Sequence, residues 1–245
     1  MTLDIDIGNT RLKWRYGLQR GFLDTAGLSA EVLQSGWKGL AAPVRVRFVS
    51  VAAESVEQQL KDYCQRAWSV VAEKATSQPS QAGVVNSYAH FQTMGADRWL
   101  AMLAGYNRAG ACCVVDCGSA VTVDYVNASG QHLGGYIAPG IRLMRKGLLS
   151  NTRQIHLPEE SLTRFDTRPG RSTEEAVGHG IELMMAALAE RVVRDCKALL
   201  GDEARLLVAG GDGERFLEAA GMGECCADLV LDGLSWALPV GQEAG

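Results

Sequence analysis

The sequence has no basic run and no lysine-rich tail, and its 28 acidic residues outnumber its 24 lysines and arginines, for a formal charge of −4. A general nucleic-acid binder usually needs a positive face, so that class is not supported. The sequence also lacks an apolar run long enough to span a bilayer. Acidic residues at positions 4 and 6 argue against a secretory signal peptide. We therefore expect a cytoplasmic protein with no nucleic-acid partner and no membrane partner.

Metal-binding cysteine patterns are missing too. The seven cysteines are an odd number, and they include the adjacent pairs Cys112-Cys113 and Cys225-Cys226. No Cys-x-x-Cys and no zinc-like spacing of cysteine and histidine occurs. We interpret these residues as reduced, mostly buried thiols.

The amino-acid composition is that of a folded protein, with 47% hydrophobic and 21% charged residues in a chain of 245. This length suits two small hydrophobic cores better than one. Apolar periodicity predicts a series of strands and helices that occurs twice, and the second series begins after Gly110. The expected strands are 3–7, 12–16, 21–27, 44–51, 111–115, 121–126, 131–137, 206–209 and 228–231. The expected helices are 53–73, one from 97, 142–149, 173–200 and one from 214.

The repeated order of strand, Asp-x-Gly turn, two strands and helices predicts an α/β protein of two related halves, 1–110 and 111–245. Two halves of this kind are expected to face each other across a cleft, which is a favoured position for a ligand.

The turn after the first strand has the residues of a phosphate-binding loop. In Asp6-Ile7-Gly8-Asn9-Thr10 a glycine lets backbone N–H groups approach an anion, and Gly and Asn tolerate positive φ. Thr10 adds a hydroxyl and Lys13 a positive charge. Asp6 suits this place if Mg²⁺ lies between it and the phosphates, directly or through water. One such turn alone is also compatible with an ordinary hairpin.

A second Asp-x-Gly turn, Asp116-Cys117-Gly118-Ser119, stands at the end of the first strand of the second half. Two copies in equivalent places favour ATP binding over two unrelated hairpins. Gly210-Gly211-Asp212 is a third glycine turn, which either lets an adenine or ribose lie against the backbone or simply ends a strand.

Two predicted helix starts carry further candidates. Asp97 either caps its helix or acts as a general base. An aspartate, with an ordinary pKa of about 3.9, is weak for that task, but phosphoryl transfer mainly requires a positioned nucleophile. The residues alone leave both interpretations open. Ser172 and Glu175 have the spacing of a capping box before the helix 173–200, and such a helix start is also an anion site.

Four motifs together resemble the type III pantothenate kinases, within the superfamily of acetate kinase, sugar kinases, Hsp70 and actin. They are Asp6-Ile7-Gly8-Asn9-Thr10-x-x-Lys13, Gly95-Ala96-Asp97-Arg98-Trp99, Asp116-x-Gly118-Ser119-Ala120-x-Thr122 and Gly134-Gly135-Tyr136-Ile137-Ala138-Pro139-Gly140. The resemblance implies two actin-like (ribonuclease H-like) half-domains facing an inter-domain ATP cleft. It also implies ATP-dependent phosphorylation of pantothenate in coenzyme A biosynthesis, a homodimer, and a need for K⁺ or NH₄⁺ beside Mg²⁺.

The resemblance also implies roles for single residues. Asp97 is the catalytic base, Asp116 a ligand of the monovalent cation and Asp6 the residue that handles Mg²⁺. Thr173 contacts the substrate from the partner subunit. The implied ATP-binding set is Asp6, Ile7, Gly8, Asn9, Thr10, Arg11, Leu12, Lys13 and Ser119. The implied substrate-binding set is Tyr88, Gly95, Ala96, Asp97, Arg98 and Thr173. The chain departs from the family pattern with Phe91 for a proline, Ser119 for a threonine and Ser172 for an asparagine.

The sequence is less compatible with two other functions. A non-catalytic, nucleotide-binding accessory factor in transcription is disfavoured because Asp6, Lys13 and Asp97 are all intact. An ATP-driven binding machine like Hsp70 or actin needs large insertions or a further domain, for which 245 residues leave no room.

Overall fold

The computed structural model describes residues 1–151 and 166–240. The chain divides into two compact units. The first contains residues 1–108 together with the segment from Asp228 onward, and the second contains residues 109–227. Each unit is described by itself.

The first unit is built on a five-stranded sheet with the order β3-β2-β1-β4-β5. β1 pairs antiparallel with β2 and parallel with β4, so the hairpin and the crossover meet at the central strand. The strands are β1 (Thr2–Ile7), β2 (Arg11–Tyr16), β3 (Gln19–Asp24), β4 (Arg45–Ser50) and β5 (Ala72–Lys74).

One face of this sheet is apolar because alternate residues of a strand point the same way. Leu3, Ile5 and Ile7 are fully buried there, against α1 (Ala30–Gly36) and α2 (Glu54–Trp68). The helix expected over 53–73 ends early, because Ser69 adopts a left-handed conformation and the chain then enters β5. α1 was not predicted; it begins at the Ser29 N-cap.

The rest of the first unit is a loop region followed by a helix. The loop contains the short strands β6 (Ser80–Gln81) and β7 (Val84–Val85) and the 3-10 helix η1 (Phe91–Thr93). α3 (Ala96–Ala109) follows and is buried over most of its length.

The segment after Asp228 was predicted as a strand, and this prediction is wrong: it forms the helix α7 (Leu229–Ala237). A short apolar run is compatible with a strand or a helix, and here packing against the rest of the first unit favours the helix. Gly233 lies so close to α3 that an added Cβ would stand 2.7 Å from Leu100 Cβ. Arg47 donates from Nη1 to the carbonyl oxygen of Leu238 at 3.2 Å. α7 therefore belongs to the first unit, although the sequence placed it in the second half.

The second unit repeats the first sheet strand for strand, with the order β10-β9-β8-β11-β12. The duplication expected from the sequence is thus present in the topology. The strands are β8 (Cys112–Cys117), β9 (Ala120–Val126), β10 (His132–Pro139), β11 (Arg205–Ala209) and β12 (Glu224–Cys225). The helices are α4 (Ile141–Asn151), α5 (Thr173–Leu200) and α6 (Gly213–Ala220).

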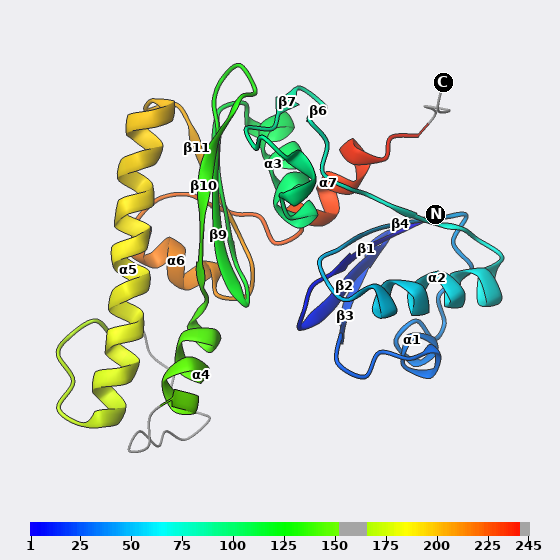
Figure 1. Ribbon diagram of the computed structural model, residues 1–245, viewed down its shortest axis with the longest axis horizontal. Helices are drawn as coiled ribbons and strands as arrows, with labels where there is room; N and C mark the ends of the chain where they lie inside the picture. The colour runs from blue at the N-terminus through cyan, green and yellow to red at the C-terminus, as the bar shows by residue number, and fades with distance from the viewer. Residues whose placement is uncertain (152–165, 241–245) are drawn as a thin grey trace. The chain divides into compact units, whose positions relative to one another are not determined.

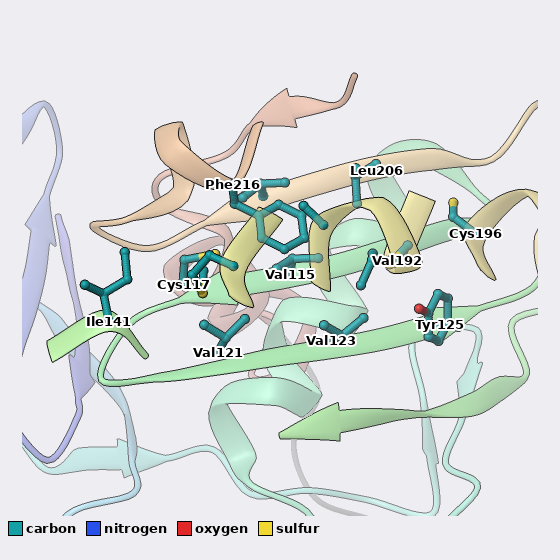
Figure 2. Close-up of a cluster of buried hydrophobic side chains, with 14 of the residues drawn as sticks. Val115, Cys117, Val121, Val123, Tyr125, Ile141, Val192, Cys196, Leu206 and Phe216 are labelled. Atoms are coloured by element: carbon teal, nitrogen blue, oxygen red, sulfur yellow. The ribbon is translucent and has the colours of Figure 1, made fainter. Parts of the chain in front are cut away.

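The core of the second unit lies between this sheet and α5, which runs along the sheet in Figure 1. Val115 of β8, Val123 of β9 and Val192 of α5 point into one apolar cluster with Phe216 of α6 (Figure 2). Gly201 ends α5 with a φ of 88°. The bounds of α5 are those predicted from its apolar stripe.

Candidate functional site

The first phosphate turn joins β1 to β2. The Gly8 N–H donates to the Arg11 carbonyl oxygen at 2.9 Å, and the Thr25 hydroxyl donates to the Gly8 carbonyl oxygen at 2.8 Å. Neither Gly8 nor Asn9 has a positive φ, so that part of the sequence argument is wrong. Glycine is favoured for a different reason: a Cβ at Gly8 would stand only 3.3 Å from the Arg11 carbonyl oxygen.

Asp6 and Lys13 lie opposite each other in the β1–β2 register. Asp4 and Arg15 form the next pair on the same face, which is opposite the apolar one. Asp4 is buried and accepts two hydrogen bonds from Arg47, at 2.8 and 3.0 Å. Arg47 and Arg15 thus both bind the middle of β1, at the residue pair before Asp6 and Lys13. The sequence signalled nothing of this pairing, because Asp4 and Arg47 are 43 positions apart.

The Gly95–Arg98 motif forms the start of α3. Asp97 Oδ1 accepts from the Arg98 N–H at 2.7 Å, which places a carboxylate at a helix N-terminus, where it is stabilised. A Cβ at Gly95 would stand 2.7 Å from that same oxygen. Gly95 therefore makes room for the Asp97 carboxylate. Asp97 is the second residue of α3, and its carboxylate binds a backbone N–H of the first helical turn.

Tyr88 and Arg98, two predicted substrate ligands, are brought together. Arg98 is buried, and its Nη1 donates to the Tyr88 hydroxyl oxygen at 2.9 Å. The loop before them is fixed by Asn86, whose side-chain oxygen accepts from the Tyr88 N–H at 3.0 Å. Phe91, where the family pattern implies a proline, begins η1, and the contact between Tyr88 and Arg98 is present in this loop.

The second phosphate turn follows β8. The Gly118 N–H donates to the Ala120 carbonyl oxygen at 3.0 Å, and the Gly140 N–H donates to the Ser119 carbonyl oxygen at 2.9 Å. A Cβ at Gly140 would stand 2.7 Å from that Ser119 oxygen. Gly140 is therefore required for β10 to end against this turn.

The third glycine turn packs on the second. β11 runs parallel to β8, with Ala209 beside Asp116, so the two strands end at the same edge of the sheet. The Asp212 N–H donates to the Cys117 carbonyl oxygen at 3.1 Å. Gly210 has a φ of 89°, and a Cβ there would stand 2.5 Å from Asp116 Oδ1. The Asp116 carboxylate therefore lies where the second and third glycine turns meet.

Cys117 lies inside the second turn but does not serve as a nucleophile. Its side chain is buried in the core, and this burial, followed by the charges of Asp116 and Asp212, raises the pKa of the thiol far above its usual value. The thiol therefore stays protonated at neutral pH, and thiolate is the reactive form.

Thr173 is the first residue of α5 and is exposed. The predicted capping box is present in a variant form. Ser172 Oγ accepts from the Glu175 N–H at 3.1 Å, while Glu175 Oε2 accepts from the Arg171 N–H instead of the Ser172 N–H. Thr173 belongs to the second unit, whereas Tyr88, Asp97 and Arg98 belong to the first.

Within residues 1–151 and 166–240, no helix is both long enough and apolar enough to cross a membrane. The same residues hold no group of three or more histidine, cysteine or acidic side chains arranged around a metal ion. Mg²⁺ does not need such a group, because it keeps several waters and binds through one or two carboxylates and the substrate's phosphates. Single carboxylates at Asp6 and Asp116 fit cations that arrive with, or beside, a nucleotide.

Two copies of one α/β unit, each with an Asp-x-Gly turn after its first strand, define a kinase-like protein of the actin fold. Solved structures agree at the level of the fold. A Campylobacter jejuni protein described as a candidate Baf family transcriptional activator matches with a TM-score of 0.60 at 20% identity, over 95% of both chains. A Sinorhizobium meliloti protein described as a candidate 2-dehydro-3-deoxygalactonokinase matches with a TM-score of 0.53 at 14% identity, over 100% of this chain and 99% of the other.

Sequence comparison gives the family. The family model for type III pantothenate kinase matches residues 2–195. The type III pantothenate kinase of Marinobacter nauticus is 43% identical over 241 residues, which cover 96% of each chain. The chain belongs to the type III pantothenate kinase family.

Proposed function

We propose that this protein transfers the terminal phosphoryl group of ATP to pantothenate, the first step of coenzyme A biosynthesis. The observation that carries the proposal is the Gly95–Arg98 motif at the start of α3, with Arg98 bound to Tyr88, in a chain of this family. Pantothenate has a hydroxyl that accepts the phosphoryl group and a carboxylate that a guanidinium can bind.

The phosphoryl donor is ATP with Mg²⁺, and both Asp-x-Gly turns contact it. The first turn, from Asp6 to Lys13, takes the phosphates through backbone N–H groups and the lysine charge. Bound Mg²⁺ neutralises the negative charge that the phosphates carry in the transition state. In the second turn Ser119 contacts ATP, and Asp116 with neighbouring backbone oxygens holds K⁺ or NH₄⁺. An oxygen donor set of this kind suits a hard cation.

Asp97 is the general base for the attacking hydroxyl. Its carboxylate is fixed by the Arg98 N–H and by the space that Gly95 leaves. A weak base suffices because the loose transition state of phosphoryl transfer mainly requires an oriented nucleophile.

The active species is a homodimer in which Thr173 of one subunit contacts the substrate of the other. Exposed apolar side chains on β10 and α5, which supply a surface for a second copy, support this part of the proposal. They are Tyr136, Ile137, Leu183 and Met184. The protein works in the cytoplasm, where ATP is available.

A transcriptional accessory role is not favoured. The neighbour described in those terms shares only 20% identity and supports the fold alone. The relative at 43% identity is named as a kinase.

The test is ADP release by the purified protein with Mg²⁺ and K⁺ or NH₄⁺, with pantothenate compared against sugars and acetate. We expect release that depends on pantothenate alone. Release with a sugar or acetate and not with pantothenate would refute the proposed substrate.

A further inference from the structure

Two side-chain links join the start of α3 to the loop before it. One is the hydrogen bond from Arg98 Nη1 to the Tyr88 hydroxyl oxygen. The other comes from the next residue of the helix, because Trp99 Nε1 donates to the Gln81 side-chain oxygen at 3.3 Å. Trp99 is fully buried, and a buried indole N–H needs an acceptor. Gln81 of β6 supplies that acceptor.

The Gln81 amide is held at its other end as well. Its Nε2 donates to the carbonyl oxygen of Ala237, the last residue of α7, at 2.8 Å. The last carbonyl groups of a helix have no acceptor role within the helix, so this bond also satisfies α7. The indole N–H can only donate and the carbonyl can only accept, which fixes the direction of the amide. Gln81 therefore connects the end of α7 to the first turn of α3.

The segment that contains Gln81 also supports Tyr88. β6 pairs antiparallel with β7, and the Asn86 N–H donates to the Pro79 carbonyl oxygen at 2.9 Å just beyond that pairing. Asn86 Oδ1 in turn accepts from the Tyr88 N–H at 3.0 Å. Gln81 and Tyr88 thus belong to one hydrogen-bonded segment, and they bind consecutive residues of α3. A shift of this segment at Gln81 would move the Tyr88 hydroxyl relative to Arg98.

We propose that Gln81 is a positioning residue for the substrate-binding pair Tyr88 and Arg98, and that it acts through the Trp99 indole. The inference rests on the proposed function, in which the Arg98 guanidinium binds the carboxylate of pantothenate. Gln81 acts without contacting the substrate, by fixing the loop and the first turn of α3 to each other. An apolar side chain of the same length cannot do this, because it offers the indole no acceptor.

The first test is Gln81→Met, which keeps the length of the side chain and removes both hydrogen bonds. We expect the KM for pantothenate to rise about three- to tenfold, the equilibrium factor that one hydrogen bond contributes. kcat and the KM for ATP should stay unchanged. Trp99→Phe keeps a buried aromatic ring, removes the donor and should raise the same KM by a similar factor. Steady-state kinetics with each substrate varied in turn measures these quantities.

The path through Trp99 is tested with the double variant Q81M/W99F. Both single variants break the same bond, so the double variant should raise the KM for pantothenate no further than Gln81→Met alone. Effects of the two substitutions that multiply would show independent action and would overturn the inference.

Gln81→Glu separates the two ends of the amide. It keeps the acceptor for Trp99 and loses the donor to Ala237, so its KM for pantothenate should stay near the wild-type value. A rise equal to that of Trp99→Phe would assign the effect to α7 and overturn the path through the indole. This pair of variants carries the test if Gln81→Met does not fold.

Asn107→Leu is the matched control, because Asn107 also binds this hairpin from α3. Its Nδ2 donates to the carbonyl oxygen of Ala82, the residue after Gln81, at 2.8 Å, but it lies near the other end of α3 from Arg98. Asn107→Leu should lower the urea midpoint of unfolding and leave the KM for pantothenate unchanged. A rise in this KM like that of Gln81→Met would show a general loosening of the hairpin and would contradict the inference.

Wild-type activity separates this inference from the proposed function. A wild-type protein that phosphorylates pantothenate, with an unchanged KM for pantothenate in Gln81→Met and Trp99→Phe, would overturn the inference and leave the proposed function intact. A wild-type protein that does not phosphorylate pantothenate would refute the proposed function and the inference with it.

Discussion

Arg98 Nη1 donates a hydrogen bond to the Tyr88 hydroxyl oxygen at 2.9 Å, and the Arg98 side chain is buried where it does so. Tyr88 therefore fixes the direction of a guanidinium that has little freedom of its own. We predict that Tyr88→Phe, which removes only the acceptor, raises the KM for pantothenate several-fold and leaves the KM for ATP unchanged. Steady-state kinetics with each substrate varied in turn checks this. An equal change in both KM values would show that Tyr88 acts on the fold and not on the substrate.

Asp97→Asn keeps the size of the side chain and an oxygen that can accept from the Arg98 N–H, but it cannot take a proton. We expect normal folding by circular dichroism and a fall in kcat of about 10²- to 10⁴-fold, the usual contribution of a general base. Asp62→Asn is a suitable control, because Asp62 is an exposed residue of α2. Near-wild-type turnover of Asp97→Asn would remove Asp97 from the role of base.

Gly140→Ala should damage the second phosphate turn, because the new Cβ would stand 2.7 Å from the Ser119 carbonyl oxygen. The backbone has to shift, and we expect weaker ADP binding and a loss of about 1–3 kcal/mol in the free energy of unfolding. Calorimetry and urea titration measure the two effects. Gly180→Ala, on α5, is the matched control, because its Cβ position has no contact within 4 Å beyond its chain neighbours and its own helix backbone. If Gly140→Ala matched this control in both measurements, Gly140 would not shape the turn.

Subunit mixing tests whether Thr173 serves the neighbouring active site. Asp97→Asn and Thr173→Val proteins are each expected to be nearly inactive. Mixed dimers would contain one site with both wild-type residues, so activity should rise to about a quarter of wild type after exchange in a symmetric dimer. No recovery, with exchange confirmed by mass measurement of tagged subunits, would place both residues in the same subunit's site or exclude the dimer.

Thiol labelling tests the burial of the cysteines. All seven are free, and Cys225 alone is exposed. Burial raises the pKa of Cys64 and of Cys112 to about 12, so these thiols stay protonated and unreactive at neutral pH and lose protons only as the pH approaches 12. Iodoacetamide followed by peptide mass spectrometry should modify Cys225 in the native protein and all seven cysteines in urea. Fast native labelling of Cys64 or Cys112 would contradict the structure.

Much of the fold could be predicted because local pattern determined it. The alternation at 3–7 and 12–16 matches β1 and β2, and the apolar stripe and Gly201 located both ends of α5. The run at 229–231 was misread, since three apolar residues suit a strand or a buried helix. Contacts distant in sequence decide between them, such as the approach of Gly233 to Leu100.

In the candidate site too, features within one sequence segment could be predicted and contacts between distant segments could not. Motifs identified the two phosphate turns and the residues at the start of α3, because glycines and aspartates at fixed spacing are visible in one segment. The pairing of Asp4 with Arg47 joins residues 43 positions apart, and no local signal marks it. Long-range ion pairs depend on how distant segments pack, which the sequence pattern does not specify.

The most direct test follows the phosphoryl group itself. The protein is incubated with ATP labelled in its γ-phosphoryl group, Mg²⁺, K⁺ and pantothenate, and the products are separated and identified by mass. We predict labelled phosphopantothenate in amounts equal to the ADP formed, and almost none with Asp97→Asn. ADP that forms without labelled phosphopantothenate, or equal labelling by the wild type and Asp97→Asn, would contradict a pantothenate kinase with its base at the start of α3.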